Sequence, residues 1–161
     1  MTQRFPMTPA GLEKLRAELR EIKEVHRPQN VADIEVALDH GDLRENAEYH
    51  AAKERQALLA GRMSHLEGRI GLAQVIDPTQ TTSDRVAFGA TVTLLDMNTD
   101  EQIIYRLVGE DESDVKAGKV SIGAPIARAL LGKEAGDDAT VRLPKGEREY
   151  EIVKVEYKRI D

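Results

Sequence analysis

Acidic side chains are concentrated in one short segment of the chain, residues 38–50, with the sequence LDHGDLRENAEYH. If a helix begins near Leu43, Glu45 and Glu48 lie one turn apart on one face. Carboxylates are the hard oxygen ligands that Mg²⁺ prefers, but two of them alone bind Mg²⁺ weakly in water. The segment therefore lacks the further ligands that a complete metal site needs. Its acids are Asp39, Asp42, Glu45 and Glu48, grouped around Gly41.

The same acids also fit a structural role. Asp42 takes the N-cap position of the following helix and Glu45 lies three residues later, which is a capping pattern. Each acid near a helix N-terminus contributes a few tenths to about 1 kcal/mol. Capping needs only one or two acids, however, and does not explain why a long arm should carry them. An acidic pair at the end of a rigid arm suits insertion into the active site of a partner.

Other kinds of chemistry lack the residues they need. The chain has no cysteine, which excludes disulfides and thiolate zinc sites. His40 and His50 are ten positions apart in the sequence, and no two histidines have the i, i+4 spacing of a helical zinc site. A glycine-rich phosphate loop is absent, and no serine has an evident base nearby. A self-contained metal or catalytic site is therefore not predicted.

Two long helices are predicted to position the acids, over about residues 8–75. Thr8 and Pro9 form a good helix start, with a hydroxyl N-cap followed by proline. Apolar residues then recur at alternating spacings of three and four, which is a heptad seam. Two helices of about 30 residues, joined at Gly41, make an antiparallel hairpin about 45 Å long. The seam positions are Leu12, Leu15, Leu19 and Ile22, then Tyr49, Ala52, Gln56, Leu59, Met63, Leu66, Ile70 and Ala73.

Pro28 interrupts the first of these helices. The apolar stripe that ends at Ile22 resumes on the opposite side of a straight helix. Proline removes a backbone donor and bends a helix, so we expect a kink or short break over residues 26–29 that redirects the stripe. The alternative is that the first helix ends there. The displaced stripe consists of Val31, Ile34 and Leu38.

The second half of the chain has the pattern of a small β domain. Residues 77–84 are polar and rich in turn formers, which predicts a linker. Strands are predicted over residues 90–96, 101–108, 139–144 and 148–157, and a short helix over residues 124–132. The predicted fold class is α+β. Residues 1–76 form a coiled-coil hairpin with its acidic tip near residues 40–45, and residues 85–161 form an antiparallel sheet covered by one short helix.

Composition restricts the partners of the chain. Its 161 residues are 40% hydrophobic and 32% charged, with a formal charge of −6. Proteins that bind duplex DNA through its backbone present basic surfaces, so independent strong binding of duplex DNA is not expected. No apolar run approaches the ~20 residues that span a membrane. The first residues, MTQRFPMTPAG, lack the apolar core of a signal peptide, so we expect a cytoplasmic protein with no membrane partner.

A family resemblance emerges from the tip segment. The sequence HGDLRENAEYHAAKE, residues 40–54, closely resembles the tip signature of the bacterial Gre transcript cleavage factors, and of their GreA type in particular. The resemblance extends over essentially the whole chain, with matching segments in the family's order. These segments are MTPAGLEKLRAEL, AQVID, RVAFGATVTL, YRLVG, SIGAPIARALLGK and EYEIVKVEY.

The resemblance implies a specific activity. Gre factors bind bacterial RNA polymerase, insert the coiled coil through its secondary channel and stimulate the polymerase to hydrolyse backtracked RNA near its 3′ end. Such a factor is not itself an enzyme and needs no cofactor in isolation. Its acids, here Asp42 and Glu45, would act with Mg²⁺ in the polymerase active centre. Asp42 would help to retain the second ion, and Glu45 would help to position or deprotonate the attacking water.

Further site residues follow from the same resemblance. Basic residues along the coiled coil contact the extruded RNA in this family, and Lys53 and Arg55 match that role. The alternative for both is a solvated helix face paired with neighbouring acids. Many GreA-type sequences have a basic residue just before the tip, where this chain has Leu38.

The second domain is FKBP-like in this family and docks at the channel entrance. The matching docking loop includes Gly123, Ala124, Pro125 and Ile126. Gly123 and Ala124 occupy positions where polar residues are common in the family. Core packing is the alternative role for Ile126.

Two other functions can be weighed against cleavage stimulation. Relatives that enter the channel and inhibit the polymerase have altered tip acids, whereas GDLRENAEYH is intact here. The FKBP-like fold by itself suggests a prolyl isomerase, but fold does not establish function. The pockets of such isomerases are lined by aromatic residues, which are scarce in this half of the chain. Its aromatic residues are Phe88, Tyr105, Tyr150 and Tyr157.

Overall fold

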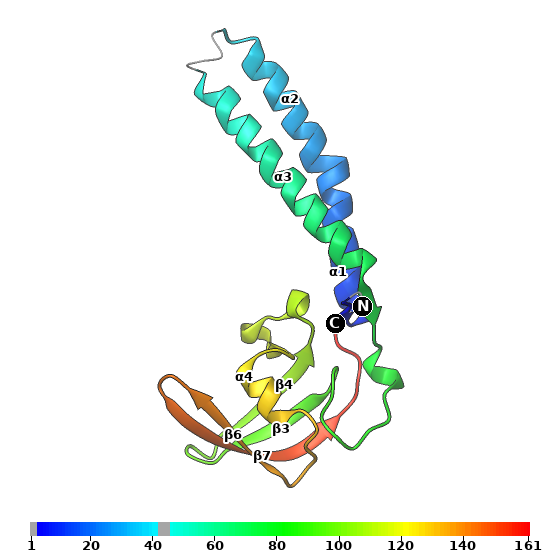
Figure 1. Ribbon diagram of the computed structural model, residues 1–161, viewed down its shortest axis with the longest axis vertical. Coiled ribbons are helices and arrows are strands. Elements are labelled where there is room, and N and C mark those ends of the chain that lie inside the picture. Colours follow the sequence, from blue (N-terminus) through cyan, green and yellow to red (C-terminus); the bar gives the residue numbers. More distant parts are fainter. Residues whose placement is uncertain (1–2, 42–45) are drawn as a thin grey trace. The chain divides into compact units, whose positions relative to one another are not determined.

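The computed structural model of the chain describes residues 3–41 and 46–161 (Figure 1). Its contacts divide the chain into two compact units. The first, called here the sheet unit, comprises Met1–Leu12 and Ala73–Asp161, and the second, the hairpin unit, comprises Glu13–Leu72. The expected hairpin domain ran from residue 1 to residue 76, whereas the contacts group both ends of that range with the sheet.

The hairpin consists of two antiparallel helical arms. The first arm is helical from α1 (Pro9–Glu21) through the π-helical turn η1 (Ile22–His26) to α2 (Arg27–Leu38). The second arm is α3 (Ala47–Gly71), which lies beside α2 (Figure 1). Long amphipathic runs of strong helix formers account for both arms. Among the residues that the structure describes, no helix has the length and apolar character needed to cross a membrane.

The π turn changes the phase of the first arm before Pro28. The backbone N–H of Arg27 donates to the carbonyl of Ile22, five residues earlier. A π turn accommodates one extra residue, so eight residues rather than about 7.2 complete two turns. Ile22 and Asn30 therefore face the same side and are both buried. Helical structure continues through residues 26–29, so the alternative that the first helix ends there is wrong. The stripe is redirected by a π turn before Pro28 and not by a break over these residues.

The redirected stripe is not the predicted one. In α2 the buried residues are Asn30 and Ala37, whereas Val31 and Leu38 are each 46% exposed. The seam of α3 follows the prediction more closely, because Ala52 and Leu66 are buried. Its other positions are partly buried except for Gln56, which is exposed. The partly buried positions are Tyr49, Leu59, Met63 and Ile70.

A five-stranded sheet in the order β5-β4-β3-β7-β6 dominates the sheet unit. Four of its strands coincide closely with the predicted ones and pair antiparallel. The fifth, β5, was not predicted and pairs with β4 in parallel, so the sheet is mixed rather than wholly antiparallel. The bounds are β3 (Thr91–Asp96), β4 (Gln102–Val108), β5 (Lys119–Ser121), β6 (Asp138–Leu143) and β7 (Gly146–Glu156).

One face of this sheet carries the hydrophobic core. The short helix α4 (Pro125–Leu130) contributes Ala127 and Leu130, which are completely buried. They pack with Leu94 and Ile152, among other inward-facing strand residues. The predicted arrangement of a sheet covered by one short helix is confirmed. The connection from β4 to β5 contains two 3₁₀ turns, η3 (Glu110–Glu112) and η4 (Val115–Ala117).

A second, two-stranded sheet belongs to the same unit. Strands β1 (Phe5–Met7) and β2 (Ala73–Val75) pair in parallel. In the sequence they lie on either side of the hairpin helices. Residues 77–84, predicted as a linker, contain the 3₁₀ turn η2 (Pro78–Gln80). Its N-cap residue Asp77 accepts a hydrogen bond from the backbone of Thr79 at 2.9 Å. The Thr79 hydroxyl and this N–H together lower the pKa of the Asp77 carboxyl.

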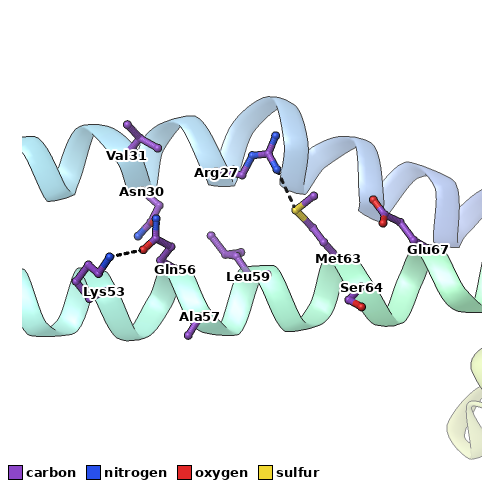
Figure 2. A pocket seen from close by; sticks show the side chains of 11 residues that line it. Arg27, Asn30, Val31, Lys53, Gln56, Ala57, Leu59, Met63, Ser64 and Glu67 are labelled. Carbon is purple, nitrogen blue, oxygen red and sulfur yellow. Dashed lines mark hydrogen bonds between the residues drawn. The ribbon is translucent and has the colours of Figure 1, made fainter.

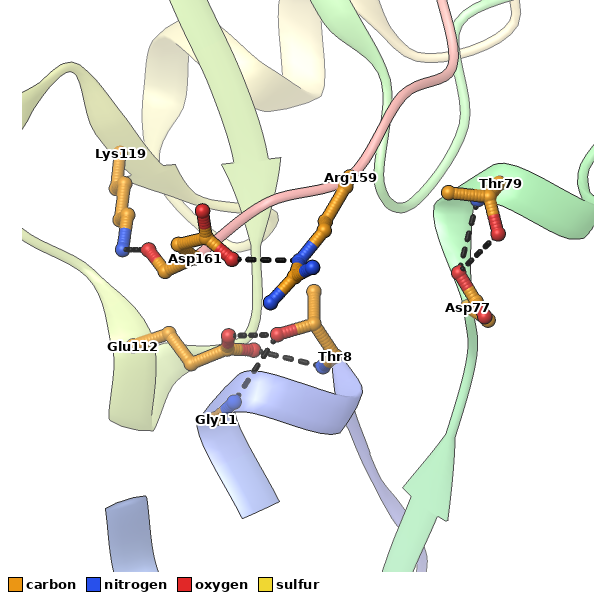
Figure 3. Close-up of polar contacts among 8 residues, drawn as sticks. All are labelled: Thr8, Gly11, Asp77, Thr79, Glu112, Lys119, Arg159 and Asp161. Carbon is orange, nitrogen blue, oxygen red and sulfur yellow. Dashed lines mark hydrogen bonds and ion pairs between the residues drawn. The ribbon is translucent and has the colours of Figure 1, made fainter. Parts of the chain in front are cut away.

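The start of α1 is fixed by a side chain from η3 (Figure 3). The hydroxyl of Thr8 accepts a hydrogen bond from the Gly11 backbone at 3.1 Å, so the predicted N-cap is confirmed. The Glu112 carboxylate accepts from both the hydroxyl and the backbone N–H of Thr8, the latter at 2.9 Å. A Cβ on Gly11 would lie 2.2 Å from Cδ of Glu112. Glycine at this position therefore permits the approach of the carboxylate.

Candidate functional site

The described part of the hairpin tip contains the end of α2, the residues up to Gly41, and the start of α3. Gly41 has a φ of +115°, a conformation that favours glycine. The chain therefore leaves the helical path at the predicted position. Asp42 and Glu45, the acids assigned to the chemistry, lie outside the described residues.

Asn46 begins the second arm. Its backbone is extended, and its Oδ1 accepts a hydrogen bond from the backbone N–H of Tyr49 at 3.0 Å. Asn46 is therefore the N-cap of α3, which corrects the assignment of that cap to Asp42 and of the helix start to Leu43. Asparagine is among the residues most favoured at an N-cap, so the presence of Asn46 could have indicated this helix start from the sequence. The cap of α3 does not need Asp42, which lies four residues before it.

The same side chain also reaches the first arm. Nδ2 of Asn46 donates to the backbone carbonyl of Ala37, with a separation of 2.5 Å. Ala37 is in the last turn of α2, where helix carbonyls lack partners within the helix. One amide therefore joins the end of α2 to the beginning of α3.

A second pair of side chains crosses the tip. Nδ1 of His40 lies 3.2 Å from Oε2 of Glu48. Glu48 is in the first turn of α3, where a carboxylate is favoured by the helix dipole. Both side chains are exposed. This contact gives Glu48 a structural role. It therefore distinguishes Glu48 from Asp42 and Glu45, the acids assigned to the chemistry.

The two candidate RNA-binding cations lie on different sides of the hairpin. Lys53 and Arg55 are two residues apart, or about 200° around α3. Nζ of Lys53 donates to Oε1 of Gln56 at 2.8 Å. Arg55 instead approaches Asp33 on the other arm, with 4.0 Å between Nη1 and Oδ2. The structure therefore does not bring these two cations together.

Lys53 lines a mostly apolar groove of about 690 Å³ between the arms (Figure 2). Arg55 lines a separate groove of about 340 Å³. Asn30 lies at both grooves and donates from Nδ2 to the carbonyl of Ala52 at 2.9 Å. Its buried Oδ1 has no hydrogen-bond partner among the described residues. Gln56 lines the same larger groove as Asn30 (Figure 2). The sequence did not single out this polar position in the seam.

The predicted docking residues lie at the start of α4 in the sheet unit. Gly123 and Pro125 are exposed, while Ala124 and Ile126 are half-buried and pack against the core. The backbone N–H of Gly123 donates to Oγ of Ser121 at 3.2 Å. Pro125 is at the first position of α4, where proline is favoured. Gly123 and Pro125 can therefore contact a partner without disturbing the core.

Metal binding depends on how many oxygen ligands the chain itself brings together. Among residues 3–41 and 46–161, no group of three or more His, Cys, Asp or Glu side chains is placed to hold a metal ion. The carboxylates of Asp42 and Glu45 are the right ligand type for Mg²⁺ but are too few to bind it tightly. Their use in metal chemistry would require ligands from a partner.

Two family profiles match consecutive parts of the chain. The profile described as "Transcription elongation factor, N-terminal" matches residues 5–75, and "Transcription elongation factor, GreA/GreB, C-term" matches residues 80–157. The transcription elongation factor GreA of Hyphomonas neptunium is 53% identical, over 97% of this chain and 99% of that protein. The chain belongs to the GreA/GreB family of transcription elongation factors.

Other members are similarly close to this GreA/GreB family chain. The GreA of Alkalilimnicola ehrlichii is 53% identical, over 96% of this chain and 98% of that protein. Solved structures also match this family member. GreA factor homolog 1 of Thermus thermophilus is 25% identical, with a TM-score of 0.44 over 95% of this chain and 99% of that one. A GreA/GreB factor from Nitrosomonas europaea is 23% identical, with a TM-score of 0.42 over 96% and 100%.

Proposed function

We propose that this elongation factor binds bacterial RNA polymerase, inserts its hairpin into the secondary channel and stimulates the polymerase to cleave backtracked RNA. The observation that carries the proposal is the 53% identity to a GreA over nearly the full length of both chains. The intact tip sequence GDLRENAEYH supports the same activity. Cleavage would release the displaced 3′ end, and elongation would resume from the new end.

The tip acids carry the proposed chemistry. Mg²⁺ in the polymerase active centre would supply charge stabilisation for the attacking and leaving oxygens. The Asp42 carboxylate would help to hold one ion, and the Glu45 carboxylate would orient the water or accept its proton. The N-cap at Asn46 supports this assignment, because α3 is capped without either acid.

The remaining contacts follow from the positions of the charged and exposed residues. Lys53 and Arg55 would contact the extruded RNA from opposite sides of α3. Leu38, which is exposed, would contribute no charge to this contact. Gly123 and Pro125 would touch the rim of the channel, with Ala124 and Ile126 fixing the loop against the core.

A cleavage assay on stalled elongation complexes tests the proposal. The wild-type chain is expected to shorten the RNA, and the double variant Asp42→Ala/Glu45→Ala to lose roughly 10²–10⁴-fold in rate, the usual contribution of acid–base groups. Asp39→Ala is the matched control, since it removes a neighbouring acid that has no assigned role.

Three outcomes would contradict parts of the proposal. A double variant that cleaves like the wild type would remove the role of the acids. Slower synthesis without shortened RNA would identify a channel-binding inhibitor instead. An equal loss in Asp39→Ala would show that total tip charge matters more than the assigned pair.

A further inference from the structure

Asn46 bridges the two arms of the hairpin at the base of its tip. Its Oδ1 accepts from Tyr49 in α3 at 3.0 Å, and its Nδ2 donates to Ala37 in α2 at 2.5 Å. The two bonds use different atoms of one planar amide, so they fix the side chain in one orientation. Both partners are backbone groups, whose positions are set by the helices themselves.

The anchor points of this bridge are held firmly. Ala37 is almost completely buried against the other arm. Its carbonyl also accepts from backbone N–H groups at the end of α2, including that of His40 at 3.2 Å, so the bond from Asn46 is an additional one to the same oxygen. Tyr49 is a half-buried seam residue of α3. The bridge therefore links two ordered backbone positions rather than two exposed side chains.

We propose that Asn46 is a positioning residue for transcript cleavage, acting through the hydrogen bond from Nδ2 to Ala37. This bond sets the separation between the end of α2 and the beginning of α3. Asp42 follows Gly41 directly in the sequence, and Glu45 immediately precedes Asn46. Both acids therefore belong to the four residues of sequence between Gly41 and Asn46, and the bridge joins the helix ends on either side of them. The assignment rests on the proposed function of the acids.

The cap and the bridge are separable by substitution. Aspartate and serine are N-cap residues about as good as asparagine, so Asn46→Asp and Asn46→Ser retain the bond from Tyr49. An ionised aspartate has no donor, and the serine hydroxyl is one bond shorter than the asparagine amide, so both variants lose the bond from Nδ2 to Ala37. The serine variant adds no charge beside Glu45, which separates loss of the bridge from a change in electrostatics. Asn46→Ala loses the cap as well.

A matched control exists in the middle of the hairpin. Asn30 also donates from Nδ2 to a backbone carbonyl of the opposite arm, that of Ala52 at 2.9 Å. Asn30→Leu removes this bond and replaces the amide by an apolar side chain that fits a seam position. Comparing Asn30→Leu with the Asn46 variants shows whether every amide bridge between the arms supports cleavage, or only the bridge beside the tip.

The experiment measures RNA cleavage in stalled bacterial elongation complexes over a range of factor concentrations. Asn46→Ser and Asn46→Asp are expected to lower the saturating cleavage rate by about tenfold or more, because small misplacements of catalytic groups are costly. The half-saturating concentration should stay within about twofold of the wild type, since the substitutions leave the docking surface intact. Asn30→Leu should cleave like the wild type. Circular dichroism melting should show that the serine and aspartate variants remain folded.

Three results would overturn this assignment. If Asn46→Ser cleaves at the wild-type rate, the bridge to Ala37 does not position the acids. If Asn30→Leu loses as much as Asn46→Ser, the effect is a general loosening of the hairpin. An inactive wild-type chain would instead refute the proposed function, and the assignment of Asn46 with it.

Discussion

Leu66 in the hairpin unit and Ile152 in the sheet unit are both completely buried, but their surroundings differ. Ile152 belongs to a continuous core formed by residues from all five strands of the larger sheet and from α4. Leu66 belongs to a single stripe between two helices, in which most other seam positions of α3 are only partly buried. A two-helix hairpin has no third layer to cover its seam, so it buries little apolar surface per residue.

Polar interactions follow the same contrast. In the hairpin unit, Arg62 and Glu18 make a two-pronged ion pair at 2.7 and 2.9 Å, but both side chains are substantially exposed. In the sheet unit, the almost fully buried Asp96 accepts from the backbone of Asn98 at 2.9 Å and from Arg148 at 3.1 Å. The hairpin therefore depends on a thin seam and on bonds at its end. The sheet unit instead has a continuous buried core.

The largest effect should come from the core of the sheet. Ile152→Ala is expected to lower the free energy of unfolding by about 4 kcal/mol, because it removes buried methylene groups and leaves a cavity. Urea unfolding followed by circular dichroism measures the loss. Val153→Ala is the control, since the neighbouring side chain is 43% exposed and should change stability little. Similar losses in the two variants would mean that burial does not explain the stability of this unit.

A smaller and more local effect is expected in the hairpin. Leu66→Ala should cost about 2–3 kcal/mol, at the lower end for such substitutions, because the thin seam can partly close over the gap. Hydrogen exchange should show faster opening of α2 and α3 than of β3 and β7. Leu58→Ala, on the same helix but 69% exposed, is the control. If Leu66→Ala lowers protection equally in both units, the predicted local opening of the hairpin is wrong.

The smallest predicted effect concerns pH. The hydrogen bond from the Asn98 backbone, assisted by Arg148, lowers the pKa of Asp96. Its stabilising contribution is therefore present above the unfolded pKa of about 3.9 and is lost as pH falls through the lower folded value. Asp96→Asn should melt below the wild type at pH 7, and the difference should shrink in acid. Glu18→Gln in the exposed hairpin pair should shift stability by about 0.5 kcal/mol or less. A pH-independent difference for Asp96→Asn would contradict the pKa argument.

The sequence by itself determined the features that depend on local patterns. Apolar spacing predicted the seam of α3, since helical periodicity places those residues on one face whatever they pack against. Alternating and β-branched runs predicted β3, β4, β6 and β7 for the same reason. The composition of residues 38–50 directed attention to the acids, and the sequence of the tip carried the family resemblance.

Tertiary structure alone decided the features that depend on distant partners. Pairing of β1 with β2, and of β4 with β5, joins short segments that have little pattern of their own. The phase of α2 follows from the π turn over Ile22–His26, and Asn30 rather than Val31 then bonds across to Ala52 of α3. The N-cap of α3 is the residue whose side chain can bond to the backbone of both arms. Asn46 has that place because its amide meets Ala37 and Tyr49 together, a coincidence in space that spacing along the chain does not encode.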